Sequence, residues 1–140
     1  MAGSLHIEVV TPERQVLSED VAAVTMPGNL GEMAVMPLHR PLLTSLRPGR
    51  FVVKTDAGER VYYLGGGFAE ILPDRVTVLA DACEAADKID TDEAAEQLKK
   101  AQEDLDSKKG RSLEENEKEI LALERAKARA SVAGEKAGAH

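Results

Sequence analysis

The sequence has little of what several large classes of protein require. It has one cysteine, Cys83, so no internal disulfide can form, and we expect a reducing compartment. It has 18 Lys and Arg against 25 Asp and Glu, a net charge of −7, whereas nucleic-acid binding needs a basic surplus. No stretch approaches about 18 uninterrupted apolar residues, and the N-terminus lacks a basic run followed by an apolar core. We therefore expect a protein that is not exported, does not span a membrane and binds no nucleic acid.

Catalytic and metal-binding motifs are also missing. The glycine triplet at residues 65–67 has neither the lysine nor the hydroxyl residue of a phosphate loop. The three histidines, His6, His39 and His140, do not have the spacing of metal ligands. His39 and Ser45 are not accompanied by a GxSxG elbow, so His39 is interpreted as a contact residue on a loop. The sequence therefore predicts no catalytic residue, no metal site and no obligatory cofactor.

Residues 5–81 carry short strand-like runs separated by Gly, Pro, Asn and Asp. The runs span residues 5–10, 16–17, 21–26, 32–36, 42–46, 51–55 and 61–64, and two more flank the Pro73-Asp74 turn. Evenly spaced short strands of this kind predict about nine or ten strands in an antiparallel sandwich or barrel. They exclude alternating strands and helices.

The two strands around the Pro73-Asp74 turn form the clearest meander. Alternation with period two places one set of side chains inward, namely Phe68, Leu72, Val76, Val78 and Ala80, and leaves Glu70, Arg75 and Thr77 in solvent. The triplet Gly65, Gly66 and Gly67 removes every side chain from one length of backbone, which is tolerated where another surface comes very close. We therefore expect the triplet to belong to a contact surface.

Helix signals begin after residue 87, where Ala, Glu, Lys and Leu replace the β-branched and aromatic residues. Asp90 with Glu93, and Ser112 with Glu115, form two capping boxes. The predicted helices span about residues 91–109 and 112–133.

The fold class is therefore α+β, with two parts. Residues 1–86 are predicted to form an N-terminal antiparallel β-sandwich. Residues 87–140 are predicted to form a C-terminal antiparallel hairpin of two helices, which we call the arm.

The arm is poor in large apolar residues. If each buried Leu or Ile contributes roughly 1.5–3 kcal/mol, five or six of them cannot offset about 1–2 kcal/mol for ordering each of some forty residues. We expect the arm to lean on another surface, with alternative positions within a few kcal/mol of one another. The second helix is locally basic, through Lys118, Arg125, Lys127 and Arg129. These cations either face an acidic partner or form an ordinary solvated surface.

Three segments, in this order and followed by a helical hairpin, resemble the epsilon subunit of the bacterial F-type, proton-translocating ATP synthase. They are GEMAVMPLHRPLLT at residues 31–44 with LRPG at 46–49, YLGGGFAE at residues 63–70, and VTVLAD at residues 76–81. The resemblance covers nearly the whole chain. Ala34 and Leu38 stand where the family often has glycine.

The resemblance implies a non-catalytic rotor subunit of the central stalk, peripheral to the cytoplasmic face of the bacterial inner membrane. It would link the gamma subunit to the c-ring for proton-driven ATP synthesis, and its arm would inhibit ATP hydrolysis by contacting the alpha and beta subunits. The implied ring and gamma contacts are Gly31, Glu32, Leu38, His39, Arg40, Pro41 and Leu42, together with the glycine triplet. The implied regulatory residues of the arm are Lys118, Arg125, Lys127 and Arg129.

ATP sensing is an alternative, since some bacterial members of this family bind ATP through an I/L-D-x-x-R-A motif. The chain keeps Ile89, Asp90 and Ala94 but has Glu93 in place of the arginine. A carboxylate at that position repels a phosphate. Arg125 and Arg129 would complete such a site and compensate in the folded arm. A further alternative, a β-sandwich enzyme or sugar-binding module, lacks an aromatic platform, because the sequence has no Trp, two Tyr and two Phe.

Overall fold

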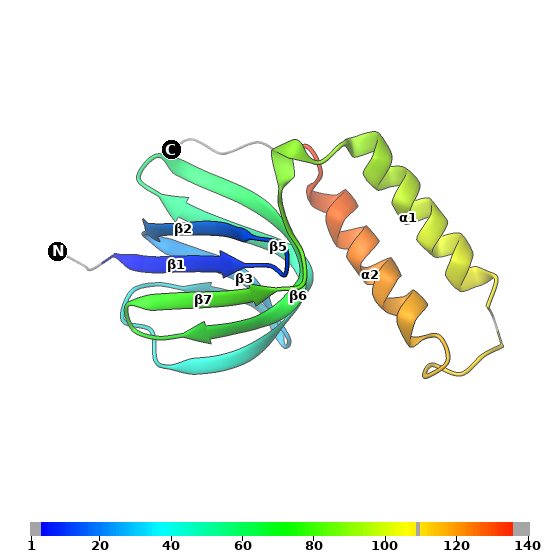
Figure 1. Ribbon diagram of the computed structural model, residues 1–140, viewed down its shortest axis with the longest axis horizontal. Helices are drawn as coiled ribbons and strands as arrows, with labels where there is room; N and C mark the ends of the chain where they lie inside the picture. Colours follow the sequence, from blue (N-terminus) through cyan, green and yellow to red (C-terminus); the bar gives the residue numbers. More distant parts are fainter. Residues whose placement is uncertain (1–3, 109, 136–140) are drawn as a thin grey trace.

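The computed structural model describes residues 4–108 and 110–135, and contains eight strands in one sheet, one 3-10 helix and two α-helices (Figure 1). The strands are β1 (Leu5–Val10), β2 (Gln15–Val21), β3 (Ala23–Gly28), β4 (Gly31–Val35), β5 (Leu42–Thr55), β6 (Gly58–Ile71), β7 (Arg75–Ala80) and β8 (Cys83–Ala85). The helices are η1 (Ala86–Lys88), α1 (Thr91–Asp106) and α2 (Glu117–Val132). The predicted class, a β-sandwich followed by two helices, is confirmed. Lys109 and His140 lie outside the described residues.

The sheet folds over on itself to form the sandwich. Its strand order is β2-β1-β7-β6-β5-β3-β4, with β8 paired to β6. The two 14-residue strands, β5 and β6, curve, so that β1, β2 and β7 face β3 and β5 across the core (Figure 1). One pairing differs from the antiparallel expectation, because β1 and β7 run parallel. The long connection between them permits either direction, whereas the short hairpin loops elsewhere require antiparallel pairs.

The strand count is lower than the nine or ten expected for residues 5–81, because two pairs of predicted strands are continuous. Residues 42–46 and 51–55 belong to the single strand β5, and residues 61–64 continue through the glycine triplet in β6. Gly and Pro at these places bend the strands without ending them. The short strand β8, just before the helices, was not anticipated from the sequence.

The register of the β6–β7 hairpin corrects one prediction about the core. Leu72 N donates to Arg75 O at 2.8 Å, which closes the turn and pairs Ile71 with Val76 and Phe68 with Leu79. A two-residue turn therefore places Ile71 and Val76 on the same face, so that Phe68 faces outward and is 58% exposed. Val76, Val78 and Ala80 are buried as predicted, and Leu72 is half-buried.

The glycine triplet is required by contacts inside the chain. A Cβ on Gly67 would lie 2.1 Å from Leu79 O of the neighbouring strand, and Gly67 has φ +140°. Gly66 also has a positive φ, +98°, and its carbonyl accepts a hydrogen bond from Asp81 N at 2.9 Å. The close surface expected at the triplet thus includes the chain's own strand β7.

The two helices run antiparallel, and α2 lies between α1 and the sheet (Figure 1). Asp90 caps α1, as its side chain accepts from the backbone N–H groups of Asp92 and Glu93. Ser112 and Glu115 form their reciprocal hydrogen bonds at 3.1 and 3.2 Å, but α2 begins only at Glu117. The first helix ends at Asp106, before the predicted limit.

A small apolar cluster joins the arm to the sandwich. Its buried members are Val52, Val61 and Tyr63 from the sheet and Ala86, Ile89, Ala94 and Val132 from the helical part. It is separate from the larger core, which lies inside the sandwich. Within residues 4–108 and 110–135, neither α-helix is both long and apolar enough to cross a bilayer. In the same residues, no group of three His, Cys, Asp or Glu is placed to hold a metal ion.

Candidate functional site

Two arginines of α2 fasten the arm to the sandwich. Arg125 Nε donates to Gly65 O at 3.0 Å, and its Nη2 to Asp81 Oδ2 at 3.2 Å. Arg129 donates to both carboxylate oxygens of Glu84, at 2.8 and 3.1 Å. We call this group, with Glu93 of α1, the clasp: Gly65, Asp81, Glu84, Glu93, Arg125 and Arg129.

Arg129 is the more enclosed of the two arginines. Its side chain is 12% exposed, and its Nη1 donates to Glu93 Oε1 and to Gln97 Oε1, each at 3.1 Å. The pKa of Arg129 is raised, chiefly by the hydrogen bond to Glu84, against the opposing effect of burial. Because Glu84 lies on β8 and Glu93 on α1, this one guanidinium joins α2 both to the sandwich and to the other helix. Undocking the arm and separating its helices therefore break contacts of the same side chain.

The end of α2 is also anchored to the sandwich. Gly134 N donates to Ala86 O at 2.8 Å, and Arg50 of β5 forms an ion pair with Glu135. Small residues of α2, including the buried Ala126, let this helix approach the sheet closely. The arm is thus fastened near its base, where α1 begins and α2 ends.

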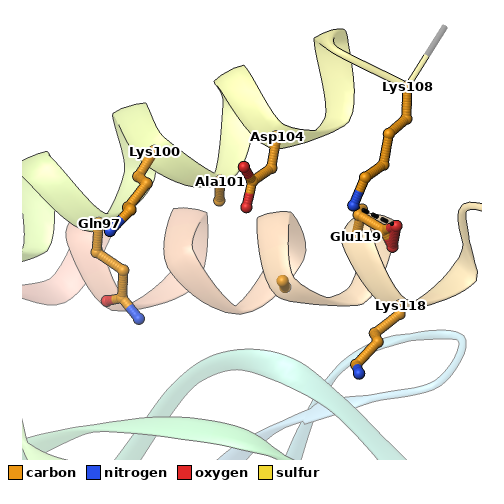
Figure 2. Close-up of a pocket in the computed structure, with 8 residues that line it drawn as sticks. Gln97, Lys100, Ala101, Asp104, Lys108, Lys118 and Glu119 are labelled. Atoms are coloured by element: carbon orange, nitrogen blue, oxygen red, sulfur yellow. Dashed lines mark hydrogen bonds and ion pairs between the residues drawn. The ribbon is translucent and has the colours of Figure 1, made fainter.

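The far half of the hairpin is less closely packed. A pocket of about 410 Å³ lies between the helices, with Ala101 and Ala122 among its lining residues (Figure 2). Lys108 Nζ and Glu119 Oε1 pair across it at 3.0 Å (Figure 2). Lys100 and Lys118 also line it. In this half the two helices are therefore joined mainly by polar contacts, including the hydrogen bond from Asn116 Nδ2 to Lys108 O at 3.3 Å.

The four predicted cations of the arm fall into two pairs. Arg125 and Arg129 belong to the clasp, whereas Lys118 and Lys127 are exposed. In this structure, therefore, two of the four cations are exposed and two are bound to carboxylates or carbonyls of the chain.

The residues that match the nucleotide-binding motif have structural roles. Ile89 and Ala94 are buried in the small cluster between arm and sandwich, and Asp90 caps α1. Glu93, at the position of the motif arginine, is an anion bound to Arg129. Arg125 and Arg129 already bind acceptors of the protein. This arrangement does not fit an additional polyphosphate.

The predicted ring-facing residues fall in two places: Gly31 and Glu32 begin β4, whereas residues 38–41 lie on the loop at residues 36–41 and Leu42 begins β5. Gly31, Glu32, Leu38, Arg40, Pro41 and Leu42 are exposed, and His39 is half-buried with its Nδ1 2.7 Å from Arg40 O. Leu38 is 80% exposed with φ 71°, and its N–H donates to Pro73 O at 2.6 Å. The loop therefore lies beside the β6–β7 turn, at the end of the sandwich away from the arm (Figure 1).

The triplet that was predicted to contact gamma lies next to the arm in this structure. Gly65 and Gly66 are buried, and Gly67 is half-buried. Gly65 accepts its hydrogen bond from Arg125.

An exposed apolar surface was missed in the sequence. Phe68 of β6 and Leu79 of β7 lie opposite each other, and each is 58% exposed. Leu43, on the neighbouring strand β5, is 73% exposed. We call these three residues the outer patch. Exposed apolar patches of this kind mark surfaces for other proteins. The two-residue turn at Pro73-Asp74, which fixes the hairpin register, is the signal that would have revealed it.

Comparison with known proteins supports the resemblance seen in the sequence. The family model described as "ATP synthase, Delta/Epsilon chain, beta-sandwich domain" matches residues 4–86. The ATP synthase epsilon chain of Desulfatibacillum aliphaticivorans is 46% identical over 109 residues, 77% of this chain and 77% of that protein. The epsilon chain of Geotalea uraniireducens is 42% identical over 139 residues, covering 98% of this chain and 99% of that protein.

Solved structures show the same fold. A chain of the Euglena gracilis mitochondrial ATP synthase, in a structure of its OSCP, F1 and c-ring, superposes with a TM-score of 0.78 at 23% identity, covering 92% of this chain and 81% of that chain. A chain of the Tetrahymena thermophila mitochondrial ATP synthase, in a structure of its central stalk and c-ring, superposes with a TM-score of 0.64 at 14% identity. The match covers 91% of this chain and 94% of that chain. From the family match and the identities to these bacterial proteins, the chain belongs to the family of ATP synthase epsilon chains.

Proposed function

We propose that the chain is a non-catalytic rotor subunit in the central stalk of an ATP synthase, peripheral to the cytoplasmic face of a bacterial inner membrane. Membership of the epsilon family supports the complex. The observation that carries the subunit's role as a connector is its pair of separate exposed surfaces. The outer patch lies on a sheet face, and the loop at residues 36–41 lies at the end of the sandwich.

The outer patch is assigned to the gamma subunit. Its three apolar side chains lie on three adjacent strands of the sheet. Phe68 pairs with Leu79 on one side and with Ser45 on the other, and Leu43 lies two residues before Ser45 on the same strand. A flat apolar surface on a sheet suits a long-lived contact with another protein, because its burial needs no rearrangement of the backbone. His39 and the glycine triplet stay proposed as further gamma contacts.

The end of the sandwich is assigned to the c-ring. Residues 38–42 expose both charged and apolar side chains there, including Leu38. Gly31 and Glu32, which stay proposed as further ring contacts, lie at the other end of β4, where Gly28 pairs with both Gly31 and Leu46. The loop at residues 36–41 lies away from the arm (Figure 1), so a ring contact there and an arm movement do not compete for the same surface.

The arm is assigned a regulatory role as a movable inhibitor of ATP hydrolysis. It has its own small contact cluster, and among the residues that the structure describes the sandwich core contains none from either helix. Undocking would leave that core intact and would free Arg125 and Arg129 of the clasp. The freed arginines, with Lys118 and Lys127, would then meet acidic surfaces on the alpha and beta subunits.

The test is an ATP hydrolysis assay with the alpha, beta and gamma subunits of the same source. Adding the full chain should lower the hydrolysis rate, and a chain that ends after residue 86 should bind equally well without lowering it. Unchanged hydrolysis with the full chain would contradict the regulatory role. Failure of either chain to bind a complex containing gamma would contradict the connector role.

A further inference from the structure

The charges of the clasp are arranged to exclude an anion. Two guanidinium groups, Arg125 and Arg129, face three carboxylates, those of Asp81, Glu84 and Glu93. The group is therefore net negative by one charge before any ligand arrives. A nucleotide phosphate brought to this place would meet like charge and would have to displace a carboxylate from an arginine.

Glu93 is the residue that decides this balance. Its carboxylate sits 3.1 Å from Arg129 Nη1, where α1 faces α2. Without Glu93, the clasp would contain two cations and two anions, and with an arginine in its place the cations would outnumber the anions. One side chain thus sets whether this region of the arm attracts or repels a phosphate.

We infer that Glu93 is a built-in anion, which satisfies Arg129 from within the chain so that the arm docks without a nucleotide and is loosened by salt. Docking then depends in part on ion pairs that are partly exposed, since the side chains of Glu84 and Glu93 are 41 and 66% exposed. Such pairs are weakened by screening. The inference concerns the arm in the isolated chain, so it does not rest on inhibition of the ATP synthase.

Hydrogen–deuterium exchange of the full-length chain tests the inference, with the amides of α2 as the readout and those of β6 and β7 as the internal reference. For the unchanged chain, millimolar MgATP or inorganic triphosphate should leave exchange in α2 as it was. Raising the salt to about 1 M should make it roughly two- to five-fold faster while the sandwich strands stay protected.

Three variants separate the role of Glu93 from that of a general surface charge. Glu93→Gln should speed exchange in α2 roughly two- to five-fold at low salt and should reduce the further effect of salt. Glu96→Gln is the matched control, because Glu96 lies three residues further on the same helix, is exposed and has no hydrogen bond or ion pair with the described residues. It should leave the exchange unchanged. Glu93→Arg should also loosen α2 but should regain protection when inorganic triphosphate is added.

Protection of α2 by MgATP or triphosphate in the unchanged chain would overturn the inference, because the arm would then be held by a ligand. Equal exchange in the Glu93→Gln and Glu96→Gln variants would overturn it as well. If Glu93→Arg stays unprotected with triphosphate while its sandwich strands remain protected, Glu93 is not the residue that excludes the anion. None of these results depends on binding to other subunits, so they are distinguishable from a failure of the proposed function.

Discussion

Phe68 lies directly opposite Leu79 on the outer face of the sheet, and each side chain is 58% exposed. We predict that Phe68→Ala and Leu79→Ala change the free energy of unfolding of the isolated chain by no more than about 0.5 kcal/mol, since surface substitutions remove few contacts. Each should weaken binding to the gamma subunit at least about ten-fold if the outer patch is the contact. Urea unfolding and a titration with gamma measure the two quantities.

Val78 supplies the control for that pair, because it lies on the same hairpin with its side chain fully buried on the inner face. Val78→Ala should destabilise the chain by about 2 kcal/mol. Unaltered gamma binding in both outer variants would contradict the assignment of the patch.

Gly67→Ala should destabilise the sandwich by about 3 kcal/mol, because the new Cβ would fall 2.1 Å from Leu79 O and would require a strained backbone. Gly31→Ala is the comparison, since Gly31 also has a positive φ, +136°, but nothing lies within 4 Å of its added Cβ. It should cost about 1 kcal/mol, from backbone strain alone. Thermal or urea unfolding gives both values, and equal costs would mean that the close approach of β7 is unimportant.

Lys118→Ala and Lys127→Ala should reduce inhibition of ATP hydrolysis without loosening the docked arm. Both side chains are exposed when the arm is docked, so we expect each to contribute little to holding it. Arg129→Ala should differ by loosening the arm of the isolated chain, because it removes the bonds to Glu84 and Glu93. Proteolysis of the isolated chain and a hydrolysis assay of the complex provide the two readouts. Faster proteolysis of the lysine variants would show that these residues belong to the docking surface.

Cys83 should resist alkylation in the folded chain at pH 8 to 9. Burial raises the pKa of its thiol to about 12, so the reactive thiolate is scarce. The ordinary pKa of the thiol is 9.0, so above about pH 9 the unfolded chain loses a proton that the folded chain keeps. The contribution of this thiol to stability is therefore fully present below about pH 9 and is lost as the pH rises toward 12. Timed labelling with and without urea checks the prediction. Rapid labelling in the absence of urea would show that the strand β8 opens readily.

The sequence revealed the fold class because strand and helix signals there are local. Gly, Pro, Asn and Asp separate the strands, and capping residues such as Asp90 mark the helices. Bends inside β5 and β6 cannot be distinguished from turns in the sequence, since a bend and a turn use the same residue types. The side of the sheet on which Phe68 lies depends on pairing with β7, and alternation along one strand cannot decide it.

The candidate site was only partly visible before the structure. Arg125 and Arg129 were singled out as cations, but their partners Asp81 and Glu84 are more than forty residues away in the chain. Glu93 was identified only as a departure from a motif. Glu93 pairs with Arg129 because of the way α1 packs against α2. Helix propensity does not determine that packing.

The parallel pairing of β1 with β7 sets the order in which this protein can assemble. Residues 6–10 pair with residues 75–79, so β1 cannot take its place between β2 and β7 in the sheet until β7 has left the ribosome. Until then β1 and β2 are an isolated hairpin, which is marginally stable in water. The sandwich therefore closes late and slowly in synthesis, as expected when contacts join distant parts of a chain. The helices, made last and from local contacts, arrive when the surface they dock on has just been completed.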